Sequence, residues 1–161
     1  MYQQRYLPAR DPLDYIKQCL TTDYANFEGR ARRSEYWFFA LGNLVVSFAL
    51  QMVSLVLTVL SALLGSDILI AVVSGGFAIL SLGVGVGLLV PGLAVAVRRL
   101  HDTGRSGWML LLALIPLVGV IVLVVFLCQD SHPAANAYGP NPKLAPTDDP
   151  LDHLEAHRGH R

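Results

Sequence analysis

The sequence predicts an all-α integral membrane protein with three transmembrane helices and an amphipathic amino-terminal helix at the interface. Two observations lead to this prediction. The chain of 161 residues is 53% hydrophobic. Its charged side chains are also absent from three long blocks, 36–66, 68–97 and 106–129. A soluble helix needs a polar face toward water, so such blocks exclude an ordinary soluble domain, and their apolar content excludes a disordered chain.

Each block is long enough to cross a bilayer. A transmembrane helix needs about 20 apolar residues to cross roughly 30 Å of hydrocarbon, and it satisfies its own backbone hydrogen bonds. We therefore expect spans at about 36–64, 68–97 and 108–128. The aromatic run at 36–39 and Trp108 suit the headgroup zone. The third block has an alternative, because Pro116 and Gly119 would let it enter the membrane and return on the same side.

The flanking segments complete a membrane domain over 11–142. Asp11 can cap a helix and Pro12 suits its first turn, which predicts a helix over 11–28. This helix is expected to pack on its own bundle at the interface, the alternative being a lipid-sensing or partner-binding helix. Residues 1–10 are expected to be flexible, 129–142 turn-rich and 143–161 disordered. The apolar face of the predicted helix comprises Leu13, Ile16, Leu20, Tyr24 and Phe27.

The distribution of Lys and Arg predicts the orientation. Six cations precede the first block, and Arg98, Arg99 and Arg105 separate the second block from the third. The loop at 65–67 has no cation. Because cytoplasmic loops carry the excess of Lys and Arg, the amino terminus and the Arg98 loop are expected in the cytoplasm. Three spans would then put the tail on the other side.

A polar row follows one face of the first predicted span, at spacings of 3 and 4. Hydroxyls and amides gain nothing from lipid, so the row is expected to face protein, with Gly83 and Gly87 of the second span allowing close approach. We favour a packing seam, since no ionisable residue lies within a span. The alternative is a polar path in a small transporter or channel component. The row consists of Asn43, Ser47, Gln51, Ser54, Thr58 and Ser61.

Two charged segments, 27–37 and 98–108, fall on the same predicted side. The favoured interpretation is a structural ion-pair cluster beneath the bundle. Binding of anionic lipid headgroups is a second interpretation. A headgroup-acting enzyme using His101 and Asp102 is a third and disfavoured one, because adjacent residues on a helix do not face each other. The candidate cluster consists of Glu28, Arg30, Arg33, Glu35, Arg98, Arg99, His101, Asp102 and Arg105.

These segments resemble bacterial inner-membrane proteins of the YhaH type, the family called domain of unknown function 805. The similarity covers about 13–143, and the resemblance implies an inner-membrane location but no activity, since none is established for the family. One departure is Ala134 and Ala135, where the family often has glycine. The motifs are Phe27-x-Gly29-Arg30-x-x-Arg33-x-Glu35-Tyr36-Trp37, Arg98-Arg99-Leu100-His101-Asp102-Thr103-Gly104-x-Ser106-Gly107-Trp108, Ile115-Pro116-Leu117-Val118-Gly119 and Asn136-x-Tyr138-Gly139-Pro140-x-Pro142.

The sequence therefore favours a non-enzymatic structural or interaction protein of the inner membrane. Its arginine-rich cytoplasmic cluster is expected to contact anionic lipid or a protein partner, including a second copy of the chain. The residue patterns indicate no catalytic residues, no cofactor and no metal site. Nucleic acid is not an expected partner, because the arginines are few and lie at membrane edges.

Overall fold

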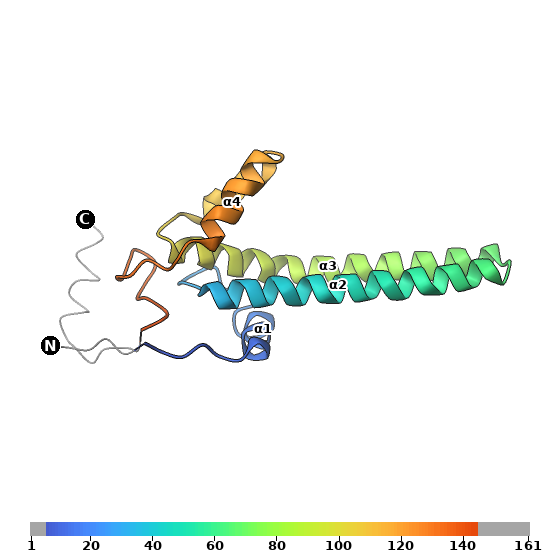
Figure 1. Ribbon diagram of the computed structural model, residues 1–161, viewed down its shortest axis with the longest axis horizontal. Coiled ribbons are helices and arrows are strands. Elements are labelled where there is room, and N and C mark those ends of the chain that lie inside the picture. Colours follow the sequence, from blue (N-terminus) through green and yellow to red (C-terminus); the bar gives the residue numbers. More distant parts are fainter. Residues whose placement is uncertain (1–5, 145–161) are drawn as a thin grey trace.

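The computed structural model describes residues 6–144, and its regular structure is helical (Figure 1). The elements are α1 (Pro12–Leu20), α2 (Arg33–Leu63), α3 (Asp67–Asp102), the 3₁₀ helix η1 (Gly107–Leu114) and α4 (Val118–Cys128). Helices α2 and α3 form a long antiparallel hairpin. Helix α1 lies beside the beginning of α2, and α4 extends away from the same end of the hairpin. We call this end, where α2 begins and α3 ends, the base.

The hairpin corresponds to the first two predicted spans. Helix α2 has 31 residues and α3 has 36, and both are apolar enough to cross a membrane. At 1.5 Å per residue they measure about 46 and 54 Å, more than the hydrocarbon thickness. Most of their large apolar side chains are exposed in the isolated chain. That pattern suits helices whose surroundings are lipid rather than water.

A continuous third span over 108–128 is wrong. The block folds into η1 and the 11-residue α4, which pack against each other around Pro116 and Leu117. Leu117 has a φ of 63°, a turn conformation, and the Val118 amide donates to the Pro116 carbonyl at 2.7 Å. Each arm is only about 16 Å long, roughly half the hydrocarbon thickness. The block therefore turns back on itself, which is the chain path that the alternative requires.

The return of the third block brings the tail back to the base. The His132 amide donates to the Asp102 carbonyl at 2.9 Å, and the Leu7 amide donates to the Lys143 carbonyl at 2.7 Å. Residues 129–144 therefore lie at the same end of the hairpin as residues 6–32, whereas a third continuous span would have placed them at opposite ends. The expectations of a flexible segment over 1–10 and a disordered one over 143–161 fall mostly outside the described residues, and the described parts, 6–10 and 143–144, are joined by the bond between Leu7 and Lys143.

Helix α1 is shorter than the predicted 11–28, since it ends at Leu20 and turns follow. Its buried side chains are Tyr15 and Cys19, whereas Leu13 of the predicted apolar face is 66% exposed. The Ile16 side chain explains Gly42 of α2, because a Cβ there would lie 3.0 Å from the Ile16 Cδ1. Glycine thus lets α1 approach α2 closely.

A proline inside α3 explains how the loop after α1 is attached to the hairpin. Pro91 has no amide proton, so the carbonyl of Gly87, four residues earlier, loses its helical partner. The hydroxyl of Tyr24 donates to this carbonyl at 2.7 Å. Tyr24 therefore fills a hydrogen-bonding vacancy that the sequence itself creates in α3.

Candidate functional site

The end of α3 positions the charged residues of the second family motif. Gly104, with a φ of 77°, adopts the left-handed conformation that ends the helix. Its amide donates to the His101 carbonyl at 3.0 Å, and the Arg105 amide donates to the Leu100 carbonyl at 3.0 Å. This pair of bonds is a Schellman motif, which explains why glycine stands at that position. It fixes the last turn of α3, which carries Arg99 and Asp102.

Three buried charges form the centre of the site, and we call them the arginine knot: Arg30, Arg99 and Asp102. Nε of Arg30 donates to Oδ1 of Asp102 at 3.0 Å, and Nη1 of Arg99 donates to Oδ2 of the same carboxylate. The side chains are 1%, 0% and 0% exposed. One carboxylate is thus shared by two guanidinium groups in a water-free environment, where the attraction is strong and every donor needs a partner.

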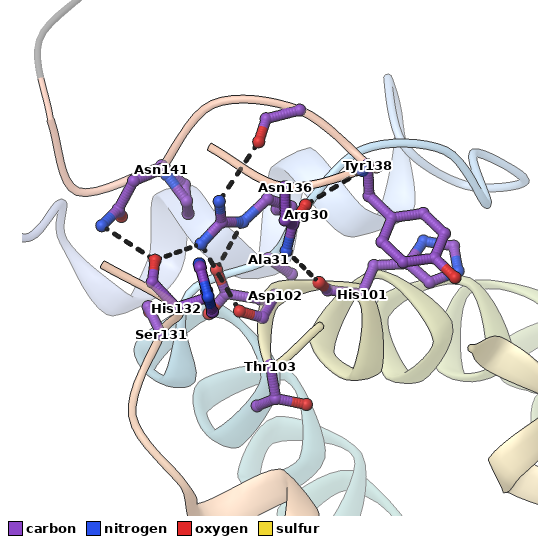
Figure 2. A network of polar contacts seen from close by, with 12 residues as sticks. Arg30, Ala31, His101, Asp102, Thr103, Ser131, His132, Asn136, Tyr138 and Asn141 are labelled. Carbon is purple, nitrogen blue, oxygen red and sulfur yellow. Dashed lines mark hydrogen bonds and ion pairs between the residues drawn. The ribbon is translucent and has the colours of Figure 1, made fainter. Parts of the chain in front are cut away.

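Backbone carbonyls satisfy the remaining donors of Arg30 (Figure 2). Its Nη1 donates to the carbonyls of Ala134 at 2.9 Å and Gly139 at 3.1 Å. Its Nη2 donates to the carbonyl of His132 at 2.7 Å. A residue just before α2 therefore holds the tail in place against the end of α3.

Arg99 makes the corresponding contacts to α4 and the loop before α2. Its Nε donates to the Leu127 carbonyl at 3.1 Å and its Nη2 donates to the Gln129 carbonyl. A longer bond of 3.5 Å joins Nη1 to the Ala31 carbonyl. The knot thus connects the end of α3 to the loop before α2 and to the end of α4. The contacts are ion pairs to Asp102 and hydrogen bonds to backbone carbonyls.

Arg98 forms a second ion-pair group at the same end of α3, with different partners. Its Nη1 donates to Oε1 of Glu35 at 2.6 Å and to Oδ2 of Asp23 at 3.2 Å. Its side chain is 4% exposed, and its Nε has no hydrogen-bond partner among residues 6–144. This group joins α3 to the first turn of α2 and to the loop after α1.

Two ionisable groups near Arg98 that lie outside the long helices have shifted pKa values. Burial raises the pKa of Asp23, but hydrogen bonds from Asn26 and Gln18 together with the Arg98 charge outweigh it, so the net pKa is lowered. The Cys19 thiol next to Glu35 has its pKa raised to about 11, first by burial and then by the carboxylate charge. Cys19 is therefore a neutral, packed thiol at ordinary pH.

His101 and Asp102 do not form an acid–base pair. The His101 ring stacks on Tyr138 with centroids 3.7 Å apart, and its Nδ1 lies 3.3 Å from the Gly29 carbonyl. The Asp102 carboxylate points to the two arginines instead. The side chain of Asn136 donates to the His101 carbonyl at 2.8 Å, so the last family motif packs against the second.

The other predicted cluster residues lie at the edge of the site. Arg33 is 46% exposed and lies 3.5 Å from Asp130, and the guanidinium of Arg105 lies 4.0 Å from the Phe126 ring centre. Glu28 is exposed. These three residues therefore do not belong to the buried network, although they share the base with it.

The polar row of α2 is only partly covered by α3. Ser61 is buried, and Ser54 and Thr58 are half-buried, whereas Ser47 and Gln51 are exposed; Asn43 is half-buried and accepts from the Ser47 hydroxyl at 3.4 Å. A Cβ placed on Gly83 or Gly87 would have no neighbouring atom within 4 Å. The expected contact between the row and these glycines is wrong, because a single neighbouring helix covers only part of the face.

Sequence reasoning missed several partners that the site requires. Asp23 and Cys19 complete the surroundings of Arg98, and Arg32 donates to the Pro142 carbonyl at 2.9 Å. The tail carbonyls that receive Arg30 carry no side-chain signature. The Asn136–Pro142 motif was the one sequence signal for this contact, because a turn with so specific a pattern implies that it packs against a defined part of the chain.

Two cavities open beside this network. The first, of about 460 Å³, lies between α1, the loop after it and the beginning of α2, and its lining includes Arg10, Glu28, Arg32 and Arg98. The second, of about 510 Å³, is mainly apolar and is lined by residues that include Phe27, His101, Trp108 and Tyr138. The first cavity brings together more charged side chains, and the second has the surface of a packing crevice.

The region that contains this site is similar to known proteins. A family model described as a protein of unknown function (DUF805) matches residues 24–140. The chain belongs to this family. The family region contains all three residues of the arginine knot, and three of the four motifs, 27–37, 98–108 and 136–142, are segments that meet at the base. The fourth motif, 115–119, forms the turn between η1 and α4.

Two relatives from Escherichia coli (strain K12) extend the comparison. The inner membrane protein YhaH is 44% identical over 132 residues, which cover 82% of this chain and 98% of the relative. The inner membrane protein YhaI is 38% identical over 122 residues, which cover 76% of this chain and 90% of the relative. No solved structure matches the chain. The family itself is described as one of unknown function.

Proposed function

We propose that this chain is an inner-membrane protein with two membrane-crossing helices, α2 and α3, and a folded cytoplasmic base. In this proposal η1 and α4 enter the membrane from the cytoplasmic side and return. The base acts as a non-enzymatic structural or interaction module that contacts anionic lipid or a protein partner. Support comes from the names of the relatives, from the cations at the base and from the cation-free loop at 65–67.

The single observation behind the non-enzymatic part is that the arginine knot is satisfied by the chain itself. The donors of Arg30 and Arg99 are accepted by the Asp102 carboxylate and by seven backbone carbonyls. These carbonyls belong to residues 31, 102, 127, 129, 132, 134 and 139. A buried charge that is fully paired organises its surroundings and offers nothing to a substrate. The knot is therefore suited to holding four chain segments in one arrangement.

Reporter fusions test the membrane arrangement. A reporter active only in the cytoplasm is expected to work after Arg161, and one active only outside the cytoplasm is expected to work in the loop at Ser66. The opposite result at Arg161, with the Ser66 result unchanged, would favour three crossings and contradict the proposal.

Native mass spectrometry after gentle extraction tests the interaction part. Anionic lipid or a second chain that stays bound is the expected result. Asp102→Asn should lower the retained fraction if the folded base makes the contact, whereas Lys17→Gln, which removes an exposed cation of α1, serves as a matched control. Equal retention in all three proteins would assign the contact to the hairpin instead.

A further inference from the structure

The cavity lined by Arg10, Arg32 and Arg98 lies at the level where both long helices leave their apolar segments. The uncharged block of α2 begins at Tyr36, directly after Glu35, and that of α3 ends at Val97, directly before Arg98. Both Glu35 and Arg98 line the cavity. In the arrangement proposed above, this is the depth of lipid headgroups and of the adjacent cytoplasm.

The cavity contains cationic side chains that no carboxylate of residues 6–144 neutralises. Arg32 donates only to backbone carbonyls, and Nη1 of Arg10 donates to the amide oxygen of Gln18 at 2.9 Å. Within residues 6–144, neither guanidinium lies within ion-pair distance of a carboxylate. This distinguishes them from Arg30 and Arg99, whose counterion is Asp102.

The inner wall of the cavity holds a further unused donor. Arg98 is paired through Nη1, yet its Nε is buried and has no partner in the described part of the chain. An unpaired donor in a buried position costs free energy, so a ligand oxygen that reached it would be stabilised. The Arg98 side chain and the guanidinium groups of Arg10 and Arg32 line the same cavity.

The charges around the cavity limit which anion fits. Four guanidinium groups line the cavity, those of Arg10, Arg30, Arg32 and Arg98, against the three carboxylates of Asp23, Glu28 and Glu35. The lining therefore has one net positive charge, and within residues 6–144 Glu28 is the carboxylate of this set that forms no ion pair. A singly charged oxyanion balances that charge, whereas a doubly charged one would be repelled by Glu28 without further compensation.

We propose that this cavity binds a phosphodiester, the singly charged phosphate group that links a lipid headgroup to its glycerol. This inference rests on the proposed function and names the ligand class of its base. Arg32 and Arg10 donate to the phosphate oxygens, since guanidinium groups match phosphate geometry, and Arg98 adds its positive charge at the lining of the same cavity. The shared chemistry admits two sources, a membrane phospholipid and a soluble phosphodiester.

Binding is measured on the full chain in a maltoside detergent, which contains no phosphate. The probes are dihexanoyl phosphatidylglycerol and its chain-free headgroup, glycerophosphoglycerol, titrated by calorimetry. Binding of the lipid but not of the headgroup supports the site with a membrane source. Equal binding of both supports it with a soluble source. If neither binds, the proposal is overturned.

Four variants assign binding to the cavity. Arg10→Gln and Arg32→Gln are each expected to weaken binding about tenfold, the effect of losing a charge-assisted hydrogen bond. Glu28→Gln is expected to tighten it several-fold, a gain that misfolding cannot imitate. Lys17→Gln, in α1 but outside the cavity, should bind as the unmodified chain does.

Arg10→Gln is the variant less exposed to a folding artefact. Arg32 also holds the Pro142 carbonyl, whereas the Arg10 side chain forms a single hydrogen bond among the described residues, to Gln18. Equal affinity in Arg10→Gln and Lys17→Gln would overturn the proposal. The reporter fusions need no ligand, so a cavity that binds nothing would leave their result, and the proposed arrangement, unaffected.

Discussion

The base and the long hairpin of this protein are stabilised in opposite ways. At the base, Arg99, Leu100 and Asp102 are 0% exposed, and arginine side chains join segments that are up to 110 residues apart. Toward the far end of the hairpin, Leu63 and Ile68 are 79% and 77% exposed, and α2 contacts only α3. One region is specific and polar, and the other is apolar with few partners.

The difference follows from the surroundings of each region. Between helices in lipid there is no hydrophobic driving force, because lipid tails are as apolar as leucine. The hairpin can therefore remain a simple pair of helices. At the base, the buried backbone and side-chain polar groups need partners, and a network that satisfies them selects one arrangement. The predictions below test this contrast.

The largest effect is expected for Asp102→Asn. Removing the shared counterion leaves two buried guanidinium groups uncompensated, which should cost about 3–5 kcal/mol. Thermal unfolding in detergent measures the loss. Asp130→Asn is the matched control, because Asp130 pairs with Arg33 and Lys143 at a position that is 63% exposed. Its cost should stay below about 1 kcal/mol, and equal costs would contradict the distinction between buried and exposed pairs.

A smaller effect is expected for Tyr24→Phe, which removes the donor to the Gly87 carbonyl. The cost should be about 1 kcal/mol, measured by the same unfolding assay. In a Pro91→Ala background the helix regains the missing amide proton, so the same Tyr24 change should cost much less. An unchanged cost in that background would mean that the hydroxyl contributes elsewhere.

Acidification should weaken the contact between the loop after α1 and α3. The pKa of Asp23 is lowered in the folded chain, so its contribution to stability is present above the ordinary Asp value of about 3.9 and disappears as pH falls through the lower folded pKa. Thermal unfolding between pH 6 and pH 3 should therefore depend less on pH in Asp23→Asn than in the unmodified chain. Parallel profiles would show that Asp23 does not contribute.

The smallest effect is expected for Gln51→Leu in the hairpin. Gln51 is exposed on α2, so the substitution should change the stability of a single chain by less than about 0.5 kcal/mol. Unfolding in detergent at low protein concentration provides the measurement. A large loss would reveal that the polar row has a partner, and a second copy of the chain would then be the first to examine.

Sequence reasoning predicted the helical class, the two long helices and the residues of the base. Arg30, Arg99 and Asp102 were all among the candidates, because charged residues between apolar blocks are few and conspicuous. It did not predict how they pair. Asp102 was considered as a partner of His101, its neighbour in sequence, whereas the helix turns the two side chains apart toward Arg30 and Tyr138.

The third uncharged block, 106–129, shows most clearly what the sequence leaves open. Its length suits a span, and Pro116 with Gly119 suits a turn, so composition alone permits both outcomes. A Cβ at Gly119 would overlap the Leu112 carbonyl, which indicates how closely the two arms pack after the turn. The packing of η1 against α4 and the hydrogen bonds from Arg99 to carbonyls at the end of α4 favour a chain that turns back toward the base.

Composition and charge distribution by themselves determined that this chain is a helical membrane protein and which end of the hairpin carries its charges. Those properties depend on the free energy of transferring side chains between water and lipid, which is local and additive along the chain. The tertiary structure alone decided that the tail returns to the base and that Asp102 joins Arg30 to Arg99. Those properties depend on pairing buried donors with acceptors far away in sequence, which only the folded arrangement specifies.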